Sequence, residues 1–322
     1  MPDLKYLPGI IPMIFGEYVL CVLGSVFYKY YCCCCGGKYS CEDSELSEDS
    51  APDSRVFKFE DTYETHSTVS KYILFATRLL SLGYIFGIST VANFIRTKGY
   101  FWFFFTYWNM ELLSVYYFFA LVCSIIGFFK RPKMQSPVGR YYVEDYSGNL
   151  KESADQKTSA PLEWSIHTVR FGHIVHALFA ICSGANALIT FVIFGFLNRS
   201  FTFWNVSTHL VPLISLLVEL SLNNMYIQVD QFAYCATWTW LYMIVIWPLV
   251  ALGALPTWPY NFLAVDKPIC FLLYTVLIVL GVVFYFIMYG LSYWKYTCRR
   301  VKGDSTEGAT NRICNFFVGS SV

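Results

Sequence analysis

Charged residues are scarce in this chain, and long stretches lack them altogether. Asp, Glu, Lys and Arg make up 14% of the 322 residues, whereas about 25% is usual in a soluble domain. Residues 171–198, 231–265 and 268–294 contain none of the four. This shortage excludes an ordinary soluble domain. Because about 20 apolar residues span a bilayer as a helix, the uncharged stretches predict transmembrane helices.

Histidine and excess basic charge are also scarce, and each shortage excludes a class of function. The net charge is +1, so nothing indicates binding to nucleic acid. The chain has five histidines, too few for the several histidine clusters of a membrane di-iron oxygenase. His173 and His176 could share one helix face, but interfacial or hydrogen-bonded histidines are the expectation here. The sequence therefore predicts neither a metal nor another cofactor.

The twelve cysteines are arranged unlike a disulfide framework or a zinc site. A zinc site needs spaced cysteine pairs and usually histidines. Here four adjacent cysteines follow a predicted span directly: Cys32, Cys33, Cys34 and Cys35. Such a juxtamembrane cluster is typical of S-palmitoylation, with unmodified thiols at the interface as the alternative. We predict that these four are lipidation sites.

Seven apolar segments indicate an all-α, polytopic helical membrane protein with a six-span core and one N-terminal span. The start lacks a basic region and a small-residue cleavage site, so the first segment is expected to be retained as a span. The predicted spans are Leu7–Tyr28, Tyr72–Ile95, Phe101–Phe129, Phe171–Leu197, about Thr208 to Ile227, Phe232–Leu255 and Cys270–Tyr293.

The predicted regions are an N-terminal span at 1–28, a loop at 29–70, the six-span core at 71–295 and a tail at 296–322. The loop is Cys-rich and then acidic, and its composition is typical of disorder. Its acidic, Ser-rich part at 42–64 is a possible binding element for a cytosolic protein partner.

Lys and Arg are distributed unequally between the two sets of connections. With seven spans, sixteen fall on the side that holds the loop and the tail, against five on the other. Because Lys and Arg favour the cytosolic side, the C-terminus is expected in the cytosol. Both glycosylation sequons, at Asn198 and Asn205, then fall on the luminal side, where such sites are modified. The sequence leaves open whether this is an endomembrane or the plasma membrane.

Thr106 and His209 form the candidate catalytic pair. The third and fifth spans both start on the luminal side. Thr106 lies roughly 7–8 Å inside the third span and His209 lies within the first turn of the fifth, so the two should lie at similar depth. A hydroxyl needs a nearby base to act as a nucleophile, and His is the usual one. Asn109, one turn from Thr106, could support an oxyanion or position the hydroxyl. The alternatives are a Thr bonded to its own i−4 carbonyl and a solvated interfacial His.

These residues carry a resemblance to a known family. The run Phe-Thr-Tyr-Trp-Asn at 105–109 resembles the second core helix of the androgen-induced membrane hydrolases. The run His-Leu-Val-Pro-Leu at 209–213, followed by Glu219, is similar to that family's fourth core helix. Trp-Pro-Tyr at 258–260 resembles its Trp-x-Tyr-Pro stretch, with the Pro displaced. The resemblance covers about residues 71–295, and the rolling stone-like proteins share the same layout.

The resemblance implies an integral-membrane threonine hydrolase that cleaves lipid esters of the fatty acid ester of hydroxy fatty acid type. Thr106 and His209 match the family's catalytic positions, and the partner would be a membrane lipid substrate or lipid ligand. The N-terminal span, the acidic loop and the long 130–170 connection depart from the family core. The alternative is a non-enzymatic rolling stone-like protein in adhesion, fusion or scaffolding. A transporter or receptor is a third possibility, for which we find no internal repeat or receptor signature.

Overall fold

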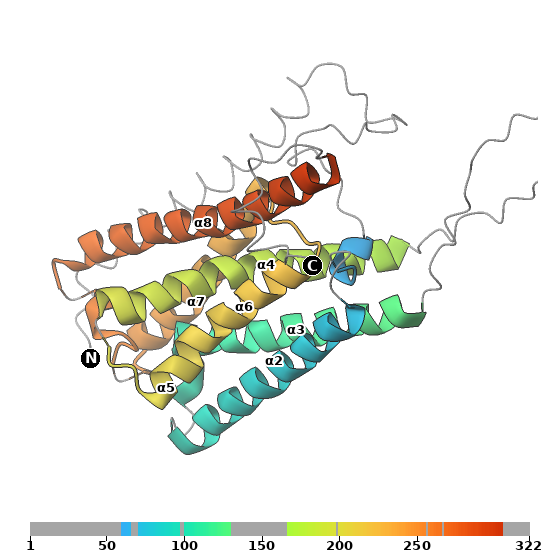
Figure 1. Cartoon of the computed structure of the whole chain (residues 1–322). Coiled ribbons are helices and arrows are strands. Elements are labelled where there is room, and N and C mark those ends of the chain that lie inside the picture. Colours follow the sequence, from blue (N-terminus) through green and yellow to red (C-terminus); the bar gives the residue numbers. More distant parts are fainter. Residues whose placement is uncertain are drawn as a thin grey trace, which may run out of the picture.

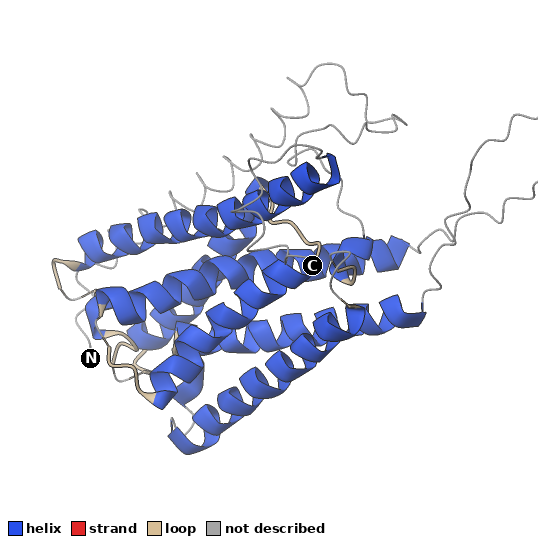
Figure 2. Ribbon diagram, in the orientation of Figure 1, coloured by secondary structure: helices blue, strands red, loops and turns tan. Residues whose placement is uncertain are grey.

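The chain folds as a bundle of membrane-length helices. In a computed structural model, residues 59–65, 70–96, 100–129, 166–197, 199–255, 257–265 and 267–304 are described. Six of the described helices are long and apolar enough to cross a membrane, which confirms the all-α, multi-pass class (Figure 1). Figure 2 shows helices joined by loops throughout this part of the chain, without a strand. The predicted N-terminal span at 1–28, the Cys32–Cys35 cluster and the acidic loop lie outside the described residues.

The six membrane-length segments follow the predicted order. The second to seventh predicted spans correspond in order to α2–η3, α3, α4–η5, α5–α6, α7 and α8. The elements are α2 (Lys71–Val91) with the π turn η3 (Ala92–Arg96), η4 (Tyr100–Phe103), α3 (Phe105–Phe129), α4 (Ile166–Phe191) with the π turn η5 (Val192–Phe196), α5 (Phe203–Asn205), the π turn η6 (Val206–Leu210), α6 (Val211–Leu222), η7 (Val229–Gln231), α7 (Phe232–Ala251), η8 (Asn261–Leu263) and α8 (Cys270–Asp304).

Helix α4 lies at the centre of the bundle, in contact with α3, α6, α7 and α8. Small residues make this possible, and the middle of α4 contains Ala180, Gly184, Ala185 and Ala187. In a membrane, where lipid is as apolar as the side chains, such small residues let neighbouring helices approach closely. More of α4 is buried inside the bundle than of any other described membrane-length helix.

The fifth span has a local irregularity that places His209. It begins five residues earlier than predicted, at Phe203, because the Thr202 side chain accepts a hydrogen bond from the Asn205 N–H and caps the helix. The π turn η6 then carries His209 in its last turn. Pro212 follows in the first turn of α6, within the continuous helical run from Phe203 to Leu222.

A short segment before the first described span closes one end of the bundle. The 3-10 turn η2 (Phe59–Thr62) precedes Tyr63, which is buried among α3 residues. A Cβ placed on Gly127 of α3 would lie 2.4 Å from Tyr63 Cδ2, so Tyr63 needs glycine beneath its ring. Thr65 forms an isolated antiparallel bridge with Asn223, just after α6. We name this the η2 end of the bundle, and the opposite end, with α5 and the 257–265 connection, the α5 end (Figure 1).

Replacing Gly127 with Ala is expected to displace the docked 59–65 segment. The new methyl group overlaps the Tyr63 ring, and overpacking of this kind costs about 1–3 kcal/mol. Faster proteolysis within 59–65, together with a lower melting temperature in detergent, is the measurement. Gly290→Ala is the matched control, because a Cβ at Gly290 meets no atom within 4 Å. Equal cleavage rates in both variants and the wild type would contradict the packing role of Gly127.

Two intramembrane charges pair with each other near the η2 end. Arg78 of α2 donates to Glu219 Oε1 of α6 through Nε at 2.9 Å and Nη2 at 2.6 Å, and both side chains are fully buried. Its Nη1 donates to the Ala120 carbonyl at 2.8 Å and to the Ser124 hydroxyl at 2.6 Å. An isolated charge in lipid is expensive, so this pair fixes α2 and α6 against α3. Glu219 therefore has a structural role and does not orient His209.

Candidate functional site

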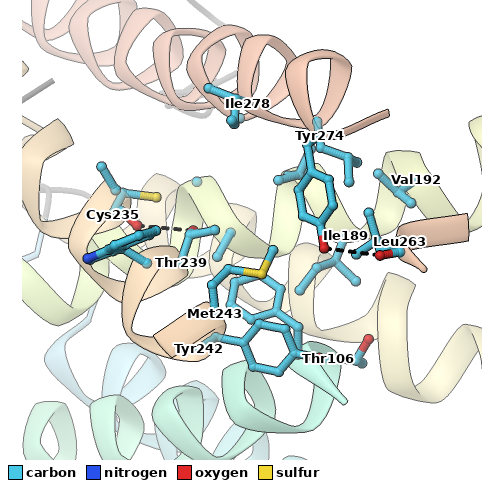
Figure 3. A pocket seen from close by; sticks show the side chains of 18 of the residues that line it. Thr106, Ile189, Val192, Cys235, Thr239, Tyr242, Met243, Leu263, Tyr274 and Ile278 are labelled. Atoms are coloured by element: carbon cyan, nitrogen blue, oxygen red, sulfur yellow. Dashed lines mark hydrogen bonds between the residues drawn. The ribbon is translucent and has the colours of Figure 1, made fainter. Parts of the chain in front are cut away.

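An apolar cavity of about 170 Å³ lies within the bundle, between α3, α4, α7, α8 and the 257–265 connection. Its walls are mostly aliphatic and aromatic, including Leu188, Ile189, Met243 and Ile278 (Figure 3). No Asp, Glu, Lys, Arg or His is among the described residues that line it. Cavities of this character bind apolar ligands and use a few polar groups to fix orientation.

Thr106 supplies the polar group at the α5 end of this cavity. Its Oγ1 lies 3.5 Å from the Tyr260 hydroxyl, and its backbone N–H donates to the same hydroxyl oxygen at 3.4 Å. Thr106 is the second residue of α3, where backbone N–H groups have no intrahelical acceptor and the helix dipole favours negative charge. The structure thus places a predicted nucleophile in an apolar cavity, at a position that favours a developing oxyanion.

Tyr260 was not predicted as a site residue. It belongs to the 257–265 connection and faces Thr106 across 154 residues of sequence. Burial raises the pKa of the Tyr260 phenol, while its hydrogen bonds with Thr106 act in the opposite direction. The phenol is consequently neutral around pH 7 and can donate its O–H. The Trp-Pro-Tyr run at 258–260 carried part of the family resemblance, but local spacing gave no sign that it meets Thr106.

Two further tyrosines at this end hold the surrounding backbone. Tyr242 donates to the Phe103 carbonyl at 2.8 Å. Tyr274 donates to the Leu263 carbonyl at 3.1 Å and accepts from Trp247 Nε1 at 3.2 Å. These bonds satisfy polar atoms that would be costly to bury alone. They also tie the chain before α3 and the 257–265 connection to α7 and α8, which fixes the position of the Thr106–Tyr260 pair.

Asn109 is not among the described residues that line the cavity. Its Nδ2 donates to the Phe105 carbonyl at 2.8 Å, and its Oδ1 accepts from Trp238 Nε1 at 3.1 Å. The side chain is fully buried and joins α3 to α7. With both ends of its amide engaged, Asn109 holds the helix that carries Thr106. The hydroxyl next to Thr106 is that of Tyr260, and this tyrosine is better placed than Asn109 to support an oxyanion.

His209 lies at the same end of the bundle as Thr106, on an element that packs against α3. Its ring meets Phe194 edge-on, with the ring centroids 6.5 Å apart. Its carbonyl accepts a hydrogen bond from Thr190 Oγ1 at 2.8 Å, and Thr190 neighbours Ile189 in the cavity wall. His209 is not among the described lining residues. Direct pairing of His209 with Thr106 stays a prediction.

The other predicted sites have different outcomes. Both ring nitrogens of His176, in α4, are hydrogen-bonded. His176 Nδ1 accepts from Gln231 Nε2 at 2.8 Å, and His176 Nε2 donates to the Tyr226 carbonyl. It is therefore a hydrogen-bonded core histidine. Asn205, a predicted glycosylation site, donates through Nδ2 to the Ser200 carbonyl at 2.8 Å. Asn198 lies outside the described residues.

Comparisons with known proteins add no family assignment. No family model, no curated protein and no solved structure matches this chain. The structure alone therefore supports the multi-pass helical fold of the described residues. A function has to be argued from the cavity and the groups that line it.

Proposed function

We propose that this chain is an integral-membrane hydrolase of lipid esters, with Thr106 as the nucleophile. One observation carries the proposal: the Thr106 hydroxyl faces an apolar cavity inside the bundle and has the buried Tyr260 hydroxyl beside it. An apolar chain occupies the cavity favourably because it leaves water. The described lining residues include no charged side chain, which fits a neutral ester. The family resemblance of residues 71–295 gives independent support for the same residue.

The proposed reaction proceeds through an acyl-enzyme. Thr106 Oγ1 attacks the ester carbonyl carbon while its proton passes to His209, and the resulting oxyanion accepts a hydrogen bond from Tyr260. The intermediate collapses, and the alcohol leaves with the proton from His209. Water then attacks the acyl-threonine with His209 again as the base, which releases a carboxylic acid and restores the Thr106 hydroxyl.

His209 has a weaker structural basis in this scheme than Thr106. Its support is the packing of η6, which carries His209, against α3. π turns occur frequently at functional sites, and His209 lies in one. The excess of Lys and Arg on the opposite connections supports a luminal α5 end and a cytosolic C-terminus. Juxtamembrane acylation of Cys32–Cys35 belongs to the same proposal.

Thr106→Val is expected to lower lipid-ester hydrolysis by about a thousandfold or more, because the nucleophile is lost. Thr106→Ser keeps a hydroxyl and should retain measurable activity. The assay is turnover of a neutral long-chain ester by the purified full chain in detergent micelles, with fluorophosphonate labelling as a second readout. Thr239→Val is the matched control, since Thr239 also lines the cavity but donates to the Cys235 carbonyl. Hydrolysis that survives in Thr106→Val would overturn the proposal.

The same assay tests the two supporting groups separately. Tyr260→Phe removes the proposed oxyanion donor and is expected to lower kcat by about 10²–10³. His209→Ala removes the proposed base and should abolish labelling, whereas His173→Ala, at an exposed position of α4, should leave it unchanged. If His209→Ala keeps full activity while Thr106→Val does not, another group accepts the proton.

A further inference from the structure

We propose that the cavity takes one extended acyl chain of a neutral ester, and that Gly281 of α8 sets the greatest chain length it accepts. This inference rests on the proposed function, because it takes Thr106 as the position of the ester carbonyl. It concerns the opposite end of the same cavity.

The hydroxyl groups that line the cavity lie at its α5 end, apart from that of Thr239, which donates to the Cys235 carbonyl. Thr106 and Tyr260 lie at the α5 end, and Tyr274 donates to the Leu263 carbonyl at the same end. Figure 3 shows Thr106 and Leu263 on one side of the cavity and Cys235 on the other. A ligand with one polar end is therefore oriented with that end at Thr106. A charged headgroup finds no opposite charge among the described lining residues, which favours a neutral ester.

The cavity extends along the helices toward the η2 end. On α8 the lining runs from Tyr274 to Val282, and along α4 and η5 it runs from Gly184 to Leu197, which directly follows η5. At 1.5 Å per residue these stretches measure about 12 and 20 Å. On α7 the lining reaches back to Phe232. An elongated apolar space of this shape matches an extended chain.

At the far end of the cavity the lining residues are Gly184, Phe232 and Cys235, and Tyr285 packs behind them. The Tyr285 ring packs against Phe232 with centroids 5.2 Å apart, and its hydroxyl donates to the Gln228 carbonyl at 2.6 Å. A Cβ on Gly184 would lie 3.1 Å from Tyr285 Cδ2 and 3.3 Å from Cys235 Sγ. Helices α4, α7 and α8 thus converge at this point and form the floor.

Gly281 lies one helical turn from Tyr285, on the cavity side of this floor. A Cβ at Gly281 would meet one atom within 4 Å, Leu188 Cδ2 at 3.7 Å, which is an ordinary contact. In contrast to Gly184, this position has room for a side chain, and the room belongs to the cavity. A larger residue there would fill the last turn above the floor, about 5.4 Å of its length.

The experiment measures binding, so that it does not depend on hydrolysis. A photo-crosslinkable methyl ester with a diazirine near the end of its chain is bound to the full chain in micelles, and labelling of the 232–243 peptide is quantified by mass spectrometry. Unlabelled methyl octanoate, dodecanoate and hexadecanoate compete. Gly281→Leu should weaken competition by the longest ester about tenfold or more, because several methylenes lose their site, and should leave the octanoate unchanged.

Two variants control this experiment. Gly290→Leu makes the same change on the same helix, where a Cβ meets no atom within 4 Å, and should leave the length profile as in the wild type. Gly281→Ala adds a single methyl group and should shift the profile in the same direction by less, which covers the case in which Gly281→Leu does not fold.

The outcomes separate the inference from the proposed function. The inference is supported if Gly281→Leu shifts the dependence of competition on chain length while Thr106→Val keeps the wild-type dependence, even where no ester is hydrolysed. An unchanged profile in both Gly281 variants, or labelling that no ester displaces, overturns it. Hydrolysis that depends on Thr106 without a Gly281 effect would keep the proposed function and discard the length limit.

Discussion

Glu219→Gln should strongly reduce the amount of folded protein, because it leaves the Arg78 charge buried without a counter-charge. Four donors converge on Glu219 Oε1: two from Arg78, the Tyr116 hydroxyl at 3.1 Å and Asn223 Nδ2 at 3.2 Å. Removing one partner of a fully buried ion pair costs about 3–5 kcal/mol. That loss is a large share of the roughly 5–15 kcal/mol by which folded proteins are stable.

The matched variants make this prediction specific to charge. Arg78→Met with Glu219→Leu removes both charges and should recover most of the stability, since a buried pair is often replaceable by apolar residues. Ser124→Ala deletes one neutral acceptor of Arg78 and should cost only about 1 kcal/mol. Melting followed by fluorescence-detected size-exclusion chromatography gives the comparison. A Glu219→Gln protein that melts with the wild type would show that the pair is not required.

Hydropathy predicted the six described spans, because an apolar run of membrane length has few alternatives to a helix in lipid. Hydropathy also places Arg78 and Glu219 inside two of these apolar runs, where charged groups are costly. Hydropathy could not predict that the two residues pair, since they are 141 residues apart. Their contact depends on which helices pack against each other. Sequence patterns give the depth of a side chain in the membrane but not the partner it meets.

Span boundaries were harder to predict where tertiary contacts decide them. The fifth span was expected to reach Ile227 but ends at Leu222, because Asn223 is extended and bridges to Thr65. The third was expected from Phe101, whereas a 3-10 turn occupies 100–103 and α3 begins at Phe105. The seventh continues to Asp304, past the expected end at Tyr293.

One part of the candidate site could likewise be predicted from the sequence, and the other part depends on tertiary packing. Thr106 was predicted from its residue type and its depth, and the structure places it in a cavity wall. Tyr260 was missed because its contact with Thr106 depends on how the 257–265 connection folds back over the start of α3. The lining of the cavity by α4, α7 and α8 likewise follows from packing around α4.

The second large effect is expected at Lys295, whose ammonium group caps the end of α6 from α8. Lys295 Nζ donates to the carbonyls of Leu220, Asn223 and Met225 at 2.9, 3.3 and 2.6 Å, and the side chain is buried. The last carbonyls of a helix have no intrahelical donor, and a positive charge there also matches the helix dipole. One lysine therefore satisfies several buried acceptors.

Lys295→Met keeps the apolar stem and removes the donor, so the carbonyls that it served become unsatisfied. The expected loss is about 1–3 kcal/mol, with faster hydrogen exchange confined to residues 223–228. Lys267→Met, at an exposed position near the α5 end, is the control. Ser292 accepts from the Ile227 N–H and Tyr285 donates to the Gln228 carbonyl, so both also hold the 223–228 segment. Global unfolding of Lys295→Met as fast as that of Glu219→Gln would therefore contradict a local capping role. Exchange unchanged from the wild type would show that the cap contributes nothing measurable.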